Sequence, residues 1–235
     1  MIVVADGDAP GRLALDAAWP GWSHGDPIVI AADGGYVRAL ALGLRPSLLV
    51  GDLDSLGPEH VAAAEVAGVT IHRSPSDKDE SDTELALLEA VRAGATGVTV
   101  LGAFGGPRLD HALANLWLLA HPALAGVPVV LLDAAARVSL MTAPRLDGSP
   151  VTRPLPGPPG GLVTLLPFGG DAAGITTHGL RYPLRDETLH TGPARGLSNV
   201  RVQTDAAVTL RSGRLLVVEA PVGAGLPEAG LSSGS

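Results

Sequence analysis

The sequence contains no cysteine, which excludes disulfide bonds, thiolate metal sites and thiol nucleophiles. Aromatic residues make up only 3% of the 235 residues, so any core must be built mainly from Ala, Val and Leu. No apolar run reaches the roughly 18 residues that would predict a membrane-spanning helix. The apolar share of 46% is nevertheless ample for one large domain or two small ones.

Positive charge is also scarce. The formal net charge is −8, no basic tract occurs, and Lys78 is the only lysine. This charge balance argues against non-specific binding of nucleic acid. The segment Met1–Asp6 reaches an acidic residue without a charged leader, so it predicts a first strand rather than a signal peptide. We therefore expect a soluble cytoplasmic protein that contacts neither nucleic acid nor membrane.

In the first half of the chain, short apolar runs alternate with helical patterns. Near-continuous apolar strands of this kind are typical of a parallel sheet covered on both faces. The expected strands are 2–5, 28–32, 47–50, 69–71, 97–101, 127–132 and 138–141, with helices at about 36–42, 58–67, 81–93 and a further one around 113–120. The pattern predicts an α/β domain, a three-layer parallel-sheet fold, over residues 1–143.

The amino-acid composition changes after residue 143. Residues 144–161 are rich in Pro and Gly and are expected to form a connection. Residues 162–222 then show short apolar runs separated by turns, without a helix-length pattern, which predicts a smaller all-β sandwich. Residues 223–235 are expected to be a disordered tail.

The segment 76–87 concentrates acidic side chains. Five of the eight residues from Asp77 to Glu84 are acidic, and Lys78 lies among them. Ser81 and Glu84 have the spacing of a helix capping box, so an amphipathic helix is expected to begin directly after the cluster. Two interpretations are open at this point: a solvated loop with good capping, or carboxylates that hold a cation such as Mg²⁺.

Polar residues follow several predicted strands in the same way. Asp33 follows the second strand, Asp52 and Asp54 the third, Asp82 the fourth, and Arg108 with Asp110 the fifth. Ligands of open parallel sheets bind at the carboxyl ends of the strands, where these side chains would meet. Because such an edge would be strongly anionic, the convergence favours a divalent cation over separate turn-forming roles.

Other short motifs bear on whether the protein binds phosphate, and by which route. Asp52-x-Asp54 also has the spacing found in haloacid-dehalogenase-type phosphatases, but those carry it after their first strand. A P-loop and a Gly-x-Gly-x-x-Gly fingerprint are both absent. The glycine pairs Gly34-Gly35 and Gly105-Gly106 each precede a predicted helix, where backbone N–H groups can approach phosphate.

With these motifs in order, the sequence resembles the thiamine pyrophosphokinase (thiamine diphosphokinase) family. The resemblance covers about residues 1–220 and rests on five segments in register. They are 31–35 (AADGG), 51–55 (GDLDS), 77–87 (DKDESDTELAL), 102–115 (GAFGGPRLDHALAN) and, in the β half, 177–184 (THGLRYPL) followed by 196–199 (GLSN).

The resemblance implies transfer of the diphosphate of ATP to the hydroxyethyl group of thiamine, with AMP as second product. It also implies an α/β domain followed by a β-sandwich, and a homodimer whose active site is shared between subunits. By resemblance Asp52, Asp54 and Asp82 would hold Mg²⁺, with Asp33 nearby.

The remaining roles implied by the resemblance concern the two substrates. Lys78 and Arg108 would face the phosphates of ATP, Asp110 would help bind substrate, and Ser198 and Asn199 would meet the aminopyrimidine ring of thiamine. Two rival interpretations remain: a diphosphokinase for another alcohol such as a hydroxymethylpterin, and a non-catalytic thiamine- or nucleotide-binding protein.

Overall fold

The structure, a computed structural model, describes residues 1–223 and divides into two compact units. The N-terminal unit spans Met1–Leu140 and the C-terminal unit begins at Met141. The expected disordered tail, 223–235, lies outside the described residues except for Gly223.

The N-terminal unit is built on a sheet with the strand order β7-β6-β5-β1-β2-β3-β4. All neighbouring strands in this series are parallel except β6 and β7. Every residue of the two central strands β1 and β2 is buried, as expected for a sheet covered on both faces. The strands are β1 (Ile2–Val4), β2 (Val29–Ala32), β3 (Leu48–Gly51), β4 (Thr70–Arg73), β5 (Val98–Leu101), β6 (Val129–Leu132) and β7 (Arg137–Ala143).

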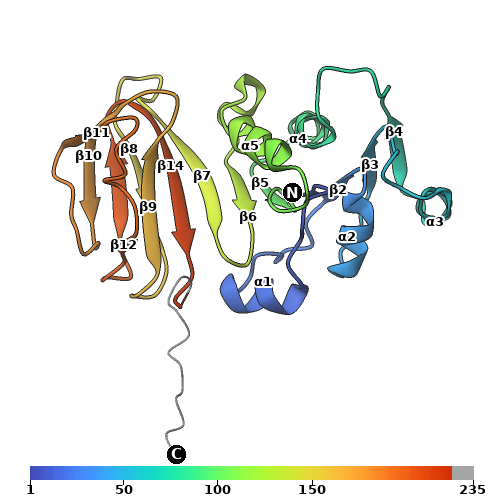
Figure 1. The fold of residues 1–235 in the computed structure, drawn as a ribbon, viewed down its shortest axis with the longest axis horizontal. Coiled ribbons are helices and arrows are strands. Elements are labelled where there is room, and N and C mark those ends of the chain that lie inside the picture. Colours follow the sequence, from blue (N-terminus) through green and yellow to red (C-terminus); the bar gives the residue numbers. More distant parts are fainter. Residues whose placement is uncertain (224–235) are drawn as a thin grey trace, which may run out of the picture. The chain divides into compact units, whose positions relative to one another are not determined.

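Helices lie on both sides of this sheet. Figure 1 shows α1 and α2 on one side and α4 and α5 on the other. Leu15 of α1 and Ala39 of α2 are fully buried against the sheet, while α4 buries Ala86, Leu87 and Ala90. The helices are α1 (Arg12–Ala18), α2 (Gly35–Ala41), α3 (Pro58–Val66), α4 (Asp82–Arg92), α5 (Leu109–Leu118) and the short 3-10 helix η1 (Pro122–Leu124).

The chain order along the sheet reverses at β1, which has β2 on one side and β5 on the other. Such a reversal opens a crevice at the carboxyl ends of the two strands, and open α/β sheets bind their ligands there. The loops that follow β1 and β5 therefore border the expected binding position.

The C-terminal unit contains two antiparallel sheets that share one core. Strands β12, β9 and β14 are neighbours in one sheet, and β11, β10, β13 and β8 form the other. Val163 and Val217 from the first sheet and Ile175 and Val208 from the second are all fully buried in one cluster. The strands are β8 (Val151–Pro154), β9 (Leu162–Pro167), β10 (Ala172–His178), β11 (Glu187–Leu189), β12 (Asn199–Val200), β13 (Ala207–Leu210) and β14 (Gly213–Ala220).

The predicted fold class, an α/β parallel-sheet unit followed by a smaller antiparallel β unit, is confirmed. Some details differ. Strand β8 lies within the segment 144–161 that was expected to be a connection, where it pairs with β13 alone as an edge strand. An edge position tolerates the missing N–H of Pro154, which explains why a Pro-rich segment can still form a strand.

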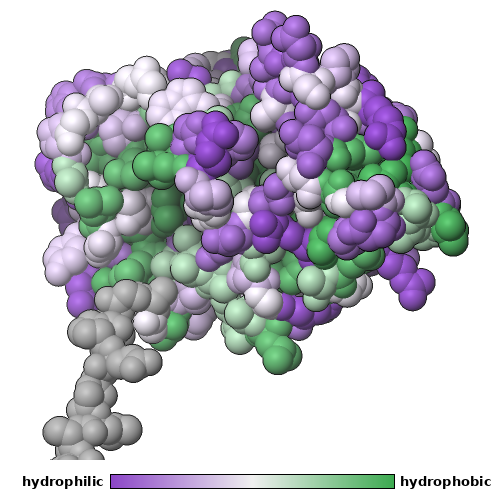
Figure 2. Space-filling model, turned by 45° about the vertical axis from the view of Figure 1, so that its right-hand side comes forward, coloured by the Kyte–Doolittle hydropathy of each residue, from purple (hydrophilic) through white to green (hydrophobic). Residues whose placement is uncertain are grey.

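The surface carries several apolar side chains. Figure 2 shows apolar patches between hydrophilic residues on one face of the molecule. Leu113 and Trp117 belong to the apolar pattern that predicts α5, but their exposed fractions are 47% and 63%. These two apolar side chains of α5 are therefore not on its buried face. No helix within residues 1–223 is long and apolar enough to cross a membrane.

Candidate active site

A cavity of about 670 Å³ opens at the carboxyl ends of the strands of the N-terminal unit. The loops after β1, β2, β3 and β5 and the start of α4 contribute to its wall. Asp33, Asp52, Lys78, Asp82, Arg108 and Asp110 all line it, and each of them is a residue that the sequence analysis selects. The convergence of polar strand ends is thus present in the structure.

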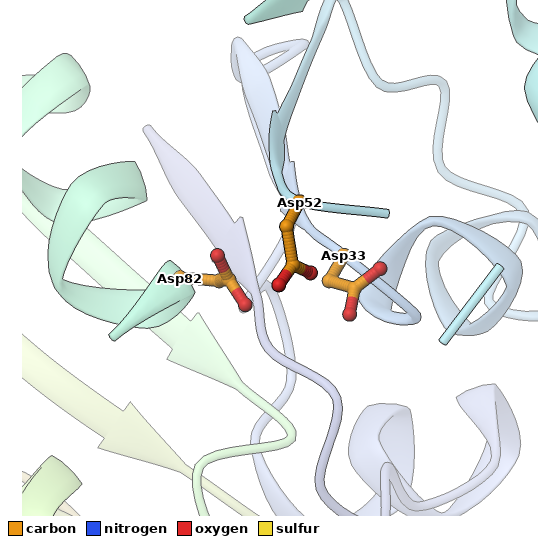
Figure 3. Close-up of side chains that lie close together, drawn as sticks. All are labelled: Asp33, Asp52 and Asp82. Carbon is orange, nitrogen blue, oxygen red and sulfur yellow. The ribbon is translucent and has the colours of Figure 1, made fainter. Parts of the chain in front are cut away.

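Three carboxylates gather on one side of this cavity. One oxygen each of Asp33, Asp52 and Asp82 can be chosen so that all lie within 4.8 Å of one another. Figure 3 shows Asp52 between the other two, with Asp82 extending from the start of α4. The closeness of the three side chains follows from the parallel pairing of β2 with β3 and from the position of α4 beside both strands.

The local backbone explains how these groups approach each other. Asp33 adopts a left-handed conformation (φ +46°), and its N–H donates to the carbonyl of Val50 in β3 at 2.9 Å. Gly51 has a φ of +145°, and a Cβ atom there would lie 3.1 Å from Oδ1 of Asp82. Glycine at position 51 therefore leaves room for the Asp82 carboxylate beside the end of β3.

Burial has a large effect on Asp33, which is only 4% exposed. Burial, reinforced by the negative charges of Asp82 and Asp54, raises the pKa of Asp33 from 3.8 to about 6, although hydrogen bonds from Ser55 oppose the rise. A carboxylate in this position is costly to keep ionised unless a cation lies next to it.

The pKa of Asp52 shifts in the opposite direction from that of Asp33. Burial acts to raise its pKa, but hydrogen bonds from the backbone of Asp54 and the side chain of Ser76, together with the charge of Lys78, outweigh it, and the pKa is lowered. Asp52 is therefore an anion at neutral pH, whereas Asp33 lies close to its titration range.

Asp54 does not belong to the three-carboxylate group. Its side chain is exposed and accepts a hydrogen bond from the hydroxyl of Ser55 at 3.2 Å, while its N–H donates to Oδ1 of Asp52 at 3.3 Å. Asp54 does line the same cavity. Its predicted role as a metal ligand stays a prediction.

The acidic segment separates into a capping part and a cavity part. Ser81 is the N-cap of α4 and accepts a hydrogen bond from the N–H of Glu84 at 3.1 Å. The side chain of Glu84 turns instead toward His121, with 3.3 Å between Oε1 and Nε2. Lys78 and Asp82 point to the cavity, and Nζ of Lys78 lies 3.0 Å from Oδ1 of Asp82.

Two buried carboxylate oxygens that accept no hydrogen bond make this group a candidate cation site. Among the described residues, Oδ1 of Asp33 and Oδ1 of Asp82 are buried and accept no hydrogen bond; the Lys78 ammonium is near the latter but not in hydrogen-bond geometry. Buried oxygens normally have a hydrogen-bond partner or an ion. Hard carboxylate oxygens on a cavity that could also take phosphates are the ligands that suit Mg²⁺. The residues present therefore fit that ion.

The two glycine pairs have mainly structural explanations. A Cβ atom at Gly35 would collide with the carbonyl of Val4, so this glycine permits α2 to start directly against β1. Gly105 and Gly106 both have φ values of +74°, a conformation that glycine adopts without strain. The N–H of Gly106 donates to Oδ2 of Asp8 at 2.8 Å, so in this structure it already has an acceptor.

Arg108 and Asp110 form a bidentate pair at the start of α5. Nη2 of Arg108 lies 2.6 Å from Oδ2 of Asp110, and its Nε lies 2.9 Å from Oδ1. Hydrogen bonding to Arg108 lowers the pKa of Asp110 to about 2. Both side chains are more than 60% exposed, so the guanidinium is oriented yet open to a ligand in the cavity.

In the C-terminal unit, Ser198 and Asn199 differ in what they can offer to a ligand. Asn199 is buried; its Oδ1 accepts from the N–H of Tyr182 at 3.0 Å, and its Nδ2 donates to the carbonyl of Tyr182 at 2.7 Å. Ser198 is exposed in a left-handed conformation, with its N–H donating to Oγ1 of Thr164. Asn199 thus fixes the backbone of Tyr182, whose side chain is 64% exposed.

Several residues of these sites were missed by the sequence analysis. Asp6 lines the cavity and Asp8 holds Gly106; both lie in the Asp-Gly-Asp turn after the first strand, so the rule of polar strand ends could have found them. Ser76 could have been suspected from its place after the fourth strand. Tyr182 could not have been linked to Asn199, because only the fold brings them together.

Comparisons with known proteins agree with this arrangement. The family model for the catalytic domain of thiamin pyrophosphokinase matches residues 22–131, and the model for its vitamin B1 binding domain matches residues 155–215. The first match lies within the N-terminal unit and the second within the C-terminal unit.

Some relatives match over almost their whole length. Thiamine pyrophosphokinase of Bacillus subtilis is 25% identical over 216 residues, which is 92% of this chain and 96% of the relative. A crystal structure of a thiamin pyrophosphokinase family protein from Enterococcus faecalis is 26% identical, covers 93% of this chain and 97% of its own, and has a TM-score of 0.75. The crystal structure of the Bacillus subtilis protein has a TM-score of 0.77 at 22% identity, covering 94% of this chain and 98% of its own, which supports the fold. Two family models together span well over half of the chain, in the same order as its two units, and the chain belongs to the thiamin pyrophosphokinase family.

Proposed function

We propose that this protein transfers a diphosphate group from ATP to the hydroxyl group of thiamine, giving thiamine diphosphate and AMP. The observation that carries the proposal is the meeting of Asp33, Asp52 and Asp82 in one cavity, two of them with a buried oxygen that accepts no hydrogen bond. Membership in the thiamin pyrophosphokinase family supplies the substrates. The comparisons favour neither of the rival functions.

The reaction forms one bond and breaks another at the same phosphorus. The thiamine hydroxyl oxygen attacks the β-phosphorus of ATP, the bond from that phosphorus to the oxygen bridging the α- and β-phosphates breaks, and AMP leaves with that oxygen. The hydroxyl proton passes to an acceptor. Such transfers depend mainly on positioning and on neutralising charge, with little covalent work for the protein.

We assign the metal-binding role to Asp33, Asp52 and Asp82, with Asp54 as a predicted further ligand at the cavity wall. When bound, Mg²⁺ supplies positive charge to the phosphate oxygens. The low pKa of Asp52 keeps that carboxylate ionised, as a ligand must be. Asp33, whose pKa is about 6, gains most from a neighbouring cation.

The cationic side chains of the cavity act on ATP. Arg108 presents an exposed guanidinium whose planar fork suits phosphate oxygens, and its pairing with Asp110 limits the directions in which it can point. Lys78, beside Asp82, contributes a point charge next to the three-carboxylate group. Gly34, Gly35 and Gly105 stay predicted backbone contacts for phosphate, whereas Gly106 is committed to Asp8 here. Asp110 and Asp33 remain the candidate acceptors for the hydroxyl proton.

The C-terminal unit would bind thiamine. Tyr182 exposes an aromatic ring on a backbone fixed by Asn199, and a flat heteroaromatic ring can stack on such a face. Ser198 stays the predicted polar contact, with Asn199 positioning Tyr182. We further propose a homodimer in which the C-terminal unit of one subunit completes the cavity of the other. The cytoplasmic location expected from the sequence stays a prediction.

The function is tested by incubating the protein with ATP and Mg²⁺ plus thiamine, a hydroxymethylpterin or no acceptor, and measuring AMP. We expect AMP and thiamine diphosphate in equal amounts only when thiamine is the acceptor. We expect neither product from Asp52→Asn. AMP formation with the pterin but not with thiamine would move the function to the rival enzyme class. Thiamine binding without AMP from any alcohol would identify a binding protein.

The dimer is tested by co-expressing Asp52→Asn and Tyr182→Ala chains carrying different tags. If each site uses the cavity of one subunit and the tyrosine of the other, purified mixed dimers have one fully intact site and therefore the wild-type KM for thiamine. The raised KM of Tyr182→Ala in the mixed dimers would place both groups within one subunit.

A further inference from the structure

The loops after β1 and β5 are interlocked at the point where the strand order reverses. The N–H of Gly7 donates to the carbonyl of Gly102 at 2.9 Å. A Cβ atom at Gly7 would collide with the carbonyl oxygens of Gly102 and Phe104, so the two backbones are in direct contact. The loop that carries Arg108 therefore rests on the turn after β1.

One side chain adds a specific link between these loops. Oδ2 of Asp8 accepts a hydrogen bond from the N–H of Gly106 at 2.8 Å, across 98 positions in the sequence. The neighbouring Gly105 packs so closely that a Cβ atom there would lie 2.7 Å from Cβ of Asp8. A bond between an ionised carboxylate and a backbone N–H is among the stronger hydrogen bonds in proteins.

The loop Gly105–Arg108 needs such a restraint because its two glycines give its backbone little rigidity. Gly105 and Gly106 both lie at φ +74°, and glycine has the greatest backbone freedom of all residues. Arg108 comes two residues after Gly106; its side chain is 64% exposed and forms an ion pair with Asp110. Fixing Gly106 thus limits where the Arg108 backbone can lie.

We infer that Asp8 is a positioning residue for diphosphate transfer: by holding the N–H of Gly106 it fixes the loop Gly105–Arg108 and so places the Arg108 guanidinium at the cavity. This inference rests on the proposed function for its catalytic consequence. Asp8 is not among the residues that line the cavity. The alternative is that Asp8 competes with a phosphate group of ATP for the Gly106 N–H. In that case removal of the Asp8 carboxylate would increase the affinity for ATP, whereas a positioning role predicts a decrease.

Steady-state kinetics separate the two possibilities. We expect Asp8→Ala to raise the KM for ATP about tenfold and to leave the KM for thiamine within about twofold. Asp8→Asn retains an acceptor oxygen and should stay within about threefold of the wild type. Asp147→Ala is the matched control, because Asp147 accepts a similar exposed backbone bond, from the N–H of Ser149 at 2.9 Å, in the C-terminal unit. A lower KM for ATP in Asp8→Ala, or an unchanged one, would overturn the inference.

A double-mutant cycle tests whether the effect passes through Arg108. If it does, Asp8→Ala causes no further loss beyond about twofold in an Arg108→Ala background. Multiplication of the two single effects would mean that Asp8 acts by another route, such as general destabilisation, and would contradict the inference.

Hydrogen exchange gives a readout that does not depend on catalysis. In Asp8→Ala the backbone amides of the segment 102–110 should exchange at least tenfold faster than in the wild type, and Asp8→Asn should restore most of the protection. Unchanged exchange in Asp8→Ala would refute the positioning role whatever the enzyme activity is. Faster exchange in a protein that forms no AMP would instead show that the proposed function is wrong and the loop contact right.

Discussion

Replacing Asp33 with Asn should stabilise the metal-free protein. The pKa of Asp33 is raised from 3.8 to about 6, mainly by burial. At pH 7 the side chain is ionised in both the folded and unfolded states, so folding bears a cost on the order of 3 kcal/mol for this group. Asn has nearly the same shape, tolerates the left-handed backbone (φ +46°) and can still accept from Ser55. The variant should therefore recover much of that cost.

The pH dependence of this cost has a definite sign. As the pH falls through about 6, the folded protein takes up a proton at Asp33 and the cost shrinks; below the ordinary pKa of 3.8 both states are protonated and the cost is gone. The stability difference between Asp33→Asn and the wild type should accordingly be largest at pH 7 and above, and should decrease toward pH 4.

The assay is urea unfolding with a chelator present, at pH 7 and at pH 5, with thermal unfolding as a second measure. A gain of 1 kcal/mol corresponds to about 2–4 °C in Tm for a chain of this size. In Mg²⁺ the order should reverse, because the wild type gains binding energy that the variant lacks. Asp79→Asn, in the exposed part of the acidic segment, is the matched control. Lower stability of Asp33→Asn in chelator at pH 7 would refute the electrostatic reasoning.

The other predictions concern the metal, the substrates and the core of the C-terminal unit. Asp52→Asn should lower kcat/KM at least about 100-fold, whereas Asp54→Asn, outside the three-carboxylate group, should lower it less than about tenfold; equal losses would make Asp54 a full ligand. Removal of divalent ions should abolish ATP binding in calorimetry, and retained affinity would contradict the cation site. Tyr182→Ala should raise the KM for thiamine about 3- to 10-fold and leave that for ATP unchanged, which steady-state kinetics would check. Arg201→Ala leaves the carboxylate of Glu219 buried without its 2.8 Å ion pair and should cost about 3–5 kcal/mol in urea unfolding; a loss below about 1 kcal/mol would mean that the pair is dispensable.

Sequence reasoning located the three-carboxylate group because parallel strands repeat one geometry. Each apolar run ends at the same edge, so the residue that follows it, such as Asp33 or Asp52, can be placed without knowing any tertiary contact. The capping role of Ser81 was accessible for a similar reason: it depends on residues three positions apart, and the N–H of Glu84 does donate to it.

The sequence pattern could not predict the surroundings of individual side chains, because these depend on how the chain folds. The pairing of Asp52 with Asp54 in one motif suggested two equivalent ligands, yet the turn after β3 directs Asp52 toward Asp82 and leaves Asp54 exposed. Likewise, Ser198-Asn199 predicted two ligand contacts, but the amide of Asn199 is engaged by the backbone of Tyr182. In both cases neighbours in sequence have different surroundings because the backbone between them turns, and their roles as ligands stay predictions.

The charge of the cavity explains why its residues need substrate and cation together. Seven acidic side chains line it against Lys78 and Arg108, which gives a formal charge of −5 with His111 neutral. A polyphosphate is repelled by such a wall, and the two cations are themselves drawn toward carboxylates, Lys78 to Asp82 and Arg108 to Asp110. A divalent ion held by Asp33, Asp52 and Asp82 would reduce the repulsion and weaken the hold of Asp82 on Lys78. We therefore expect ATP binding to depend on the metal, and we expect the same carboxylates to destabilise the fold when the metal is removed.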